Sequence, residues 1–363
     1  MNVLVDGFVL ENTYQKGIRR YLEELLRRVD VPFSMFLEEP PARALPEDWR
    51  VVGPLGPSPV SKLDLVGRWK YRERAKQWRK EIQSHSVFHT SYFRQCPILG
   101  IPSVVVVHDM VCEVMPHLFA KDPSLEISMK REAFEKADAI IAISENTKRD
   151  FSLFYPELQN KVSVVKHGAD HLIYPREKKQ NGSRFRSQAP FVFFVGDRVG
   201  YKNFHTLMDA LNEEAWPMGL DLWVAGPKFS PAELAAIQYR GLLGRIQHVG
   251  LVDEAELDWL YRNSTCFVFP SLFEGFGFPI LEAQARSAPV VANDMAIFHE
   301  VGGNAFLPCD CRNPALIAKA VCDLTNSVRR EHLIEAGLEN VKRYTWAETA
   351  RKTVAVWESV ARN

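Results

Sequence analysis

The stretch Phe269-Pro-Ser-Leu-Phe-Glu-Gly-Phe-Gly-Phe-Pro-Ile-Leu-Glu-Ala283 combines the end of an apolar run, a glycine-containing turn and the start of a helical pattern. The apolar residues from Cys266 to Phe269 predict a buried strand. Pro279 favours a helix start, because proline fits the first helical turn, where its missing N–H would be unpaired anyway. A turn between strand and helix presents free N–H groups and the positive dipole end to an anion. The stretch therefore predicts an α/β unit with an anion site after the strand.

Two carboxylates, Glu274 and Glu282, lie on either side of this turn, the second about one helical turn inside the helix. A phosphate bound between them would leave one carboxylate for the hydroxyls of a donor sugar and the other for a ribose. A purely structural interpretation fits the spacing equally well. The helix dipole alone favours glutamate in a first turn, and short glycine-rich turns are weak signals.

The composition is that of a soluble globular protein with room for two domains. The chain has 363 residues and a formal net charge of zero, which argues against a general attraction to nucleic acid or anionic lipid. Residues 1–6 are too short and too acidic for a signal peptide and predict an opening strand. No apolar run is long enough for a transmembrane helix. Six cysteines without CxxC spacing indicate a reducing cytoplasm, with no disulfide framework and no metal site.

Short apolar, β-branched runs alternate with helical patterns along the chain, as in parallel sheets covered by helices on both faces. The expected strands are 104–107, 139–143, 162–165, 191–195, 220–225 and 266–269, and clear helical patterns cover 124–137 and 204–211. Residues 176–190 are rich in Lys, Arg, Gln, Ser and Asn and predict a linker. We therefore expect an N-terminal domain over 1–176, a linker over 177–190 and a C-terminal domain over 191–344. The default ligand site is a cleft at the carboxyl ends of the strands.

Charged residues follow two of the expected strands. Arg198 and Lys202 follow 191–195 and should face the same cleft as the glycine turn, where two cations would neutralise a diphosphate leaving group. The alternative is an exposed basic loop. His108 and Asp109 follow 104–107, at a strand end that should face the cleft, which favours a functional role. The alternative interpretation is that the two residues only form a local hydrogen bond.

Together these features resemble a family 4 retaining glycosyltransferase of the GT-B superfamily, also described as glycosyl transferases group 1. The strongest match is the glutamate pair with seven residues between its members. Other matching segments are Gly17 to Tyr21, His108-Asp109, Ile143 to Lys148, Gly196 to Asn203, Val224 to Pro227 and Val249 to Val252. The resemblance implies two Rossmann-like domains with parallel sheets facing each other across a deep cleft. It is looser at Lys166-His167-Gly168, where the family commonly has Pro-Asn-Gly.

The resemblance also implies roles for individual residues. Glu274 would contact the donor sugar and Glu282 the ribose, while Arg198 and Lys202 would bind the diphosphate and His108 would lie near the reacting sugar. The implied catalytic residues are His108, Arg198, Lys202 and Glu274. The implied donor-binding residues are Gly17, Gly196, Gly226, Leu251, Val252, Gly275, Phe276, Gly277 and Glu282, and the acceptor is assigned to Lys16, Arg19 and Asp109.

Enzymes of this kind move a hexose from a nucleotide-diphosphate sugar with retention of configuration. They need no metal, because cations and a helix dipole stabilise the leaving group instead. We expect no cofactor besides the co-substrate, and we favour a GDP-mannose-like donor over UDP-sugars. The expected acceptor is a glycan or lipid-linked glycan in polysaccharide or lipopolysaccharide biosynthesis. A nucleotide-sugar epimerase of the same fold and a non-catalytic protein that kept the fold stay open as alternatives.

Two further segments concern membrane binding and the packing of the C-terminal helix. Residues 68–80 interleave basic and aromatic side chains, typical either of a helix lying on an anionic membrane or of a solvated surface helix. A peripheral position at the inner face of the membrane is therefore one expectation for this cytoplasmic protein. The C-terminal residues 345–363 form an amphipathic helical pattern. In the resembling family this helix crosses back onto the N-terminal domain, and packing on its own domain is the alternative.

Overall fold

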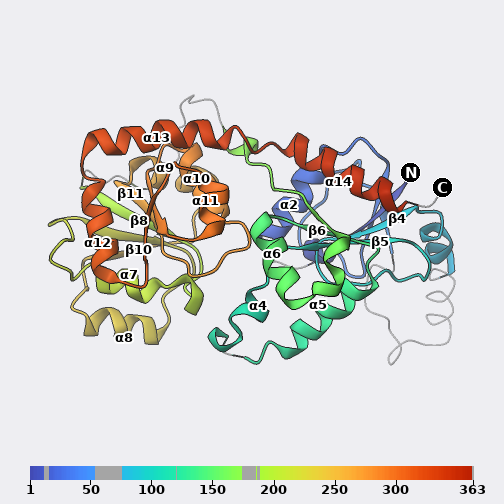
Figure 1. Cartoon of the computed structure of the whole chain (residues 1–363), viewed down its shortest axis with the longest axis horizontal. Helices are drawn as coiled ribbons and strands as arrows, with labels where there is room; N and C mark the ends of the chain where they lie inside the picture. Colours follow the sequence, from blue (N-terminus) through green and yellow to red (C-terminus); the bar gives the residue numbers. More distant parts are fainter. Residues whose placement is uncertain (12–15, 54–75, 120, 174–184, 186–188, 362–363) are drawn as a thin grey trace. The chain divides into compact units, whose positions relative to one another are not determined.

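The computed structural model describes residues 1–11, 16–53, 76–119, 121–173, 185 and 189–361. The chain divides into two compact units (Figure 1). Unit 1 comprises Met1–Glu113, Pro123–Gly168 and Trp346–Asn363, and unit 2 comprises Val114–Asp122 and Ala169–Thr345. The division after Gly168 comes earlier than the expected boundary at 176. Most of the expected linker, 177–190, lies outside the described residues.

The described part of unit 1 contains a seven-stranded sheet in the order β3-β2-β1-β4-β5-β6-β7, with parallel pairing throughout. Its strands are β1 (Val3–Asp6), β2 (Phe33–Phe36), β3 (Val51–Val52), β4 (Val87–Thr90), β5 (Ser103–Val107), β6 (Ala139–Ala142) and β7 (Val162–Val164). The central strands are buried because helices cover both faces, as their continuous apolar runs predict. The helices include α1 (Phe8–Glu11), α2 (Lys16–Leu26), α4 (Val111–Val114), α5 (Ser124–Lys136), α6 (Glu145–Phe154) and α14 (Trp346–Val360).

Helix α14 brings the C-terminal end of the chain to the sheet of unit 1, where it contacts α2, β5 and β6. The indole N–H of the buried Trp357 donates to His89 Nδ1 at 3.1 Å. The Thr349 hydroxyl donates to the Lys166 carbonyl at 2.7 Å. Buried side chains of α14 therefore fix it to strand β4 and to the segment that follows β7.

Unit 2, within its described residues, contains a six-stranded parallel sheet in the order β10-β9-β8-β11-β12-β13. Its strands are β8 (Phe191–Val195), β9 (Asp221–Ala225), β10 (Ile246–Gly250), β11 (Cys266–Phe269), β12 (Val290–Asn293) and β13 (Leu307–Cys309). Its helices are α7 (Phe204–Ala210), α8 (Pro231–Tyr239), α9 (Glu254–Asn263), α10 (Phe278–Ala285), α11 (Ala296–Gly302), α12 (Pro314–Asp323) and α13 (Ser327–Val341).

Side chains that alternate along β8 show why this sheet is covered on both faces. Val192 and Phe194 belong to a core cluster shared with α7, α8 and α12. Phe193 points the other way and packs edge-on against Tyr261 of α9, with ring centroids 5.1 Å apart. Figure 1 accordingly shows α9 and α10 on one side of the sheet and α7 and α8 on the other. A strand buried on both faces reads as one apolar run, which is the pattern of the sequence here.

The strand order of unit 2 reverses between β8 and β11. From β8 the chain builds outward through β9 and β10, and from β11 it builds the opposite way through β12 and β13. The connections that leave β8 and β11 therefore run to opposite faces of the sheet, and open α/β sheets bind ligands at the carboxyl ends of strands at such a reversal. The segments after β8 and β11 are those with the predicted cations and carboxylates.

The start of α14 allows a test of unit 1. A Cβ added to Gly168 would lie 2.2 Å from the backbone nitrogen of Trp346, a clash that no side-chain rotation relieves. We expect Gly168→Ala to reduce the free energy of unfolding by more than about 2 kcal/mol. A loss of this size lowers the melting temperature by several degrees. Gly17→Ala is the control, because nothing lies within 4 Å of the added methyl group. Equal melting temperatures for both variants, measured by differential scanning calorimetry, would contradict this packing.

Candidate functional site

The turn after β11 has the backbone geometry that the sequence predicts. Gly277 caps α10 with a φ of 87°, and Pro279 lies in the first turn of the helix. A Cβ on Gly277 would meet the Phe298 ring at 3.0 Å, so both the left-handed backbone and the space require glycine. The positive end of the helix dipole at the start of α10 is a ready site for an anion.

An ion pair joins the segments that follow β8 and β11. Lys202 Nζ lies 2.6 Å from Glu274 Oε1, with 21% and 14% of the two side chains exposed. The Leu272 N–H donates to the Tyr201 carbonyl at 2.7 Å, which ties the two segments together through their backbones as well. Asn203, with a φ of 56°, donates from its side chain to the Cys311 carbonyl at 2.7 Å. Lys202 is thus held beside the glycine turn, as its place after a neighbouring strand predicts.

Arg198 lies in a different environment from Lys202. Only 4% of its side chain is exposed, and its Nε pairs with Glu233 Oε1 at 2.5 Å. Its Nη2 donates to the carbonyls of Pro227 and Lys228 at 2.9 and 3.1 Å, and the guanidinium lies 4.7 Å from the centroid of the Phe229 ring. Among the described residues, its buried Nη1 has no hydrogen-bond partner. Arg198, predicted to bind the diphosphate, is therefore a largely buried arginine with one nitrogen, Nη1, left to donate.

Glu233 completes the arginine's surroundings and was not predicted. It is the third residue of α8, where it forms a capping box with Ser230. Burial works against its ionisation, but its hydrogen bonds with Arg198 and Ser230 prevail and lower its pKa below the ordinary value. The helix cap and the arginine thus support each other.

Two of the predicted donor-binding glycines bring backbones close together beside Arg198. A Cβ on Gly226, whose φ is 141°, would lie 2.5 Å from the Gly196 carbonyl oxygen and 3.5 Å from Arg198 Nη1. The Gly226 N–H donates to the Gly250 carbonyl at 2.9 Å. Leu251 follows Gly250 with 68% of its surface exposed, and Val252 comes next. These backbones lie at the carboxyl ends of β8, β9 and β10.

Glu282 lies on α10, eight residues after Glu274 in the sequence. Its Oε2 accepts a hydrogen bond of 3.2 Å from the hydroxyl of Tyr261, a residue of α9 that is fully buried. Tyr261 was not predicted as a site residue, because a tyrosine among apolar residues of a helix is usually a core residue. The two glutamates therefore have separate partners, Lys202 for one and Tyr261 for the other.

The predicted residues of unit 1 form a separate group. His108 lies after β5, where its Nε2 is 3.0 Å from the Ser91 carbonyl and its ring stacks on His167 at 5.9 Å. Burial lowers the pKa of His108 to about 4, so the ring is neutral near pH 7. Asp109 Oδ1 accepts from the Val111 N–H at 3.1 Å, a local turn. The buried Lys130 donates to the Asp109 carbonyl and pairs with Glu113 at 2.8 Å.

The remaining predicted residues of unit 1 lie on α2. Lys16 is the first residue of that helix and Gly17 the second. Arg19 Nε donates to Glu23 at 2.7 Å, one turn along the same helix, with 13% of the arginine side chain exposed. This pair occupies Arg19 within its own helix and adds no support to its assignment to the acceptor.

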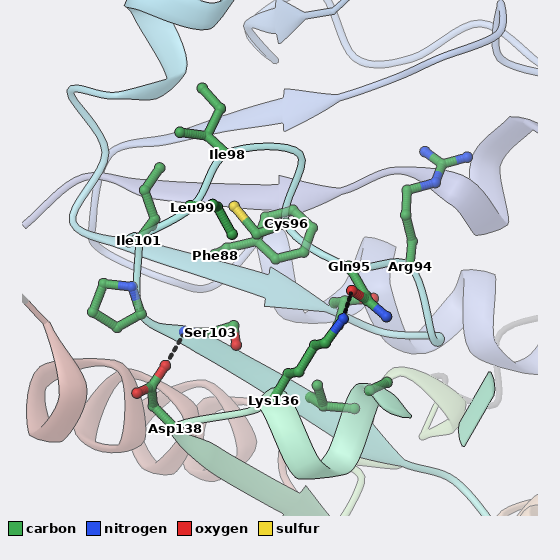
Figure 2. Close-up of a pocket in the computed structure, with 15 residues that line it drawn as sticks. Phe88, Arg94, Gln95, Cys96, Ile98, Leu99, Ile101, Ser103, Lys136 and Asp138 are labelled. Atoms are coloured by element: carbon green, nitrogen blue, oxygen red, sulfur yellow. Dashed lines mark hydrogen bonds between the residues drawn. The ribbon is translucent and has the colours of Figure 1, made fainter. Parts of the chain in front are cut away.

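Figure 2 shows a cavity in unit 1 that is separate from these groups. Its volume is about 430 Å³, and Phe88, Ile98 and Ile101 line its apolar part. At its edge Lys136 donates to Gln95 at 2.8 Å, and the Ser103 N–H donates to Asp138. None of the predicted site residues lines this cavity, so it plays no part in the candidate site.

The described residues contain no group of three or more His, Cys, Asp or Glu side chains arranged to hold a metal ion. Within the same residues, no helix has the length and apolar character that crossing a bilayer requires. Of the basic aromatic stretch 68–80, residues 68–75 lie outside the described residues, and 76–80 belong to a helix with mostly exposed side chains.

Comparison with known proteins agrees with this two-unit architecture. Residues 175–339 match the family model described as glycosyl transferases group 1, and residues 15–171 match that of glycosyltransferase family 4. The O-antigen chain mannosyltransferase B of Escherichia coli is 34% identical over 296 residues, covering 78% of this chain and 77% of that protein.

Solved structures show the same fold at low sequence identity. Sucrose-phosphate synthase from Thermosynechococcus elongatus superposes with a TM-score of 0.73 at 18% identity, covering 99% of this chain and 98% of that one. HepE of Anabaena, in complex with UDP and glucose, gives 0.70 at 16% identity, covering 99% and 100%. With its two parallel-sheet, Rossmann-like halves and these relatives, the chain belongs to the family 4 glycosyltransferases of the GT-B superfamily and is a glycosyltransferase.

Proposed function

We propose that this glycosyltransferase moves a hexose from a nucleotide-diphosphate sugar, with retention of configuration, to a glycan or lipid-linked glycan of a surface polysaccharide or lipopolysaccharide. The observation that carries the proposal is the Lys202–Glu274 ion pair beside the start of α10. A cation and the positive end of a helix dipole there meet the needs of a diphosphate. The adjacent carboxylate meets those of sugar hydroxyls.

Lys202 is the principal cation in this proposal. An ammonium group carries three donors, so Lys202 can keep Glu274 in place while it donates to a phosphate oxygen. The N–H groups of the Gly275–Gly277 turn add to it. Negative charge grows on the phosphate as the sugar–phosphate bond breaks, and donors already in place stabilise that charge most effectively.

Arg198 contributes differently. Its ion pair with Glu233 and its bonds to two carbonyls fix its position, and Nη1 is the nitrogen left for a phosphate oxygen. We therefore assign it mainly to shaping the Gly196–Gly226 backbone.

The proposed reaction uses the leaving group itself as the base. The bond between the anomeric carbon and the phosphate oxygen breaks, and the acceptor oxygen bonds to the same face of that carbon. The departing phosphate oxygen takes the acceptor's proton. Lys202 and the dipole of α10 take the electrostatic role that a metal has in other transferases.

The donor assignment rests on relatives. The E. coli protein that is 34% identical is named as an O-antigen chain mannosyltransferase, and this supports a mannosyl donor and an O-antigen-like acceptor. We favour GDP as the nucleotide, as in GDP-mannose, although the Anabaena HepE structure holds UDP. A peripheral position on the inner membrane face through residues 68–80 is part of the proposal.

Nucleotide choice can be tested by thermal-shift measurements with GDP, UDP and dTDP. A ligand that binds the folded state raises its melting temperature, and we expect the largest rise with GDP. A larger rise with UDP would reassign the base. No rise with any of the three would overturn the proposal of a nucleotide-sugar donor.

The role of Lys202 can be tested with Lys202→Ala. We expect a loss of turnover of about a hundredfold or more, typical of removing one preorganised donor to a charged transition state. The melting temperature should change little, because the ion pair is partly exposed. Lys319→Ala, at an exposed position of α12, is the matched control and should keep full activity. An active Lys202→Ala enzyme would refute the assignment.

Glu274→Gln tests the sugar contact separately from the nucleotide. The amide keeps the size of the side chain but weakens its acceptance of sugar hydroxyls. Titration calorimetry should show nearly unchanged affinity for the free nucleoside diphosphate, while turnover of the nucleotide sugar falls by at least tenfold. Equal losses in both measurements would place Glu274 at the nucleotide instead.

A further inference from the structure

We propose that Tyr261 is a positioning residue for nucleotide recognition, whose hydroxyl orients the Glu282 carboxylate toward the ribose hydroxyls of the donor. This inference rests on the proposed function, because it takes Glu282 as the ribose-binding group. It adds a residue that neither the sequence motif nor the fold assigns, and it explains how one rotamer of a flexible glutamate is selected.

The first support is the rigidity of Tyr261. The side chain is fully buried, and its ring packs edge-on against Phe193 and Phe267 at centroid distances of 5.1 and 5.2 Å. Phe193 and Phe267 belong to adjacent strands, β8 and β11. A ring held in this way by close packing points its hydroxyl in one direction. The direction is toward Glu282 Oε2, at 3.2 Å.

Arg286 fixes the two helices that carry this hydrogen bond. It is 3% exposed, and its Nη2 and Nε lie 3.3 and 3.6 Å from carboxylate oxygens of Glu254 and Asp258 on α9. Its Nη1 donates to the main-chain carbonyl of Glu282 at 3.3 Å, and its guanidinium lies 5.4 Å from the centroid of the Tyr261 ring. The arginine therefore links α9 to the end of α10 and keeps the tyrosine and the glutamate at hydrogen-bonding distance.

The chemistry of the pair makes the tyrosine a lasting donor. Burial and the nearby Glu282 carboxylate raise the pKa of the Tyr261 hydroxyl well above its ordinary value, so it keeps its proton at physiological pH. A carboxylate has about four acceptor positions, and the bond from Tyr261 uses only one of them, so this bond does not compete with the ribose hydroxyls.

This role predicts an effect that depends on the ribose. If Tyr261 acts through Glu282, its hydroxyl matters only for a ligand that has ribose hydroxyls to bind. If the tyrosine is merely a core residue, its loss should weaken every nucleotide alike or lower stability without changing selectivity. A ligand without the two hydroxyls therefore separates the two roles.

The test compares Tyr261→Phe with the unchanged enzyme by titration calorimetry against GDP and 2′,3′-dideoxy-GDP, or the corresponding uridine pair if UDP gives the larger thermal shift. Phenylalanine keeps the packed ring and removes only the hydroxyl. We expect GDP to bind about tenfold more weakly, the magnitude of one hydrogen bond to a charged group, with unchanged affinity for the dideoxy analogue. Tyr239→Phe, at a 91% exposed tyrosine of α8, is the matched control and should change neither.

Glu282→Gln completes the experiment. It should weaken GDP selectively, and adding Tyr261→Phe to it should have no further effect, because both act on one contact. Unchanged GDP affinity in Tyr261→Phe, or equal losses for both ligands, would overturn the inference while leaving the proposed function intact. An unchanged enzyme that binds neither nucleotide would overturn the proposed function itself.

Discussion

The ion pair between Lys202 and Glu274 depends on a constraint of topology, the reversal of strand order between β8 and β11. These strands are neighbours in the sheet although their following segments are 72 residues apart at the two charges. Parallel strands end at the same edge, so the reversal brings a cation from one connection to a carboxylate from the other. The glycine turn and the start of α10 complete the arrangement. In the proposed function, each of these features helps to place a diphosphate beside the carboxylate that would contact the donor sugar.

The two cations that follow β8, Arg198 and Lys202, differ in burial and in partners. Arg198 pairs with Glu233 and donates to two carbonyls, and only its Nη1 has no partner among the described residues. Such a buried arginine stabilises the loops that it joins. Lys202 is more exposed and pairs with one carboxylate. The two cations are therefore not equivalent, although the sequence offers them as a matched pair. Unequal burial is the reason that we propose the lysine, rather than the arginine, as the principal cation for the phosphate.

The sequence predicts the fold best where strands are continuously apolar. β5, β8 and β11 lie within one residue of their expected ranges. Two of the strands that were missed carry two polar residues each: β4 includes His89 and Thr90, and β10 includes Gln247 and His248. Their side chains are accommodated by tertiary partners such as Trp357, which lies 268 residues from His89. The local pattern of apolar and polar residues does not indicate partners so distant in the sequence.

The same limit applies to the candidate site. The nearness of Lys202 to Glu274 follows from strand ends and could be predicted. The burial of Arg198 depends on Glu233, 35 residues away in the sequence, and the pattern around Glu233 indicates only the start of a helix. The Tyr261–Glu282 hydrogen bond joins two different helices, and sequence patterns do not show which helices are neighbours.

The most direct test of the central claim is a crystal structure with the bound nucleoside diphosphate. We predict phosphate oxygens within hydrogen-bonding distance of Lys202 Nζ and the Gly275–Gly277 backbone. A nucleotide bound away from the carboxyl ends of β8 and β11 would contradict this claim.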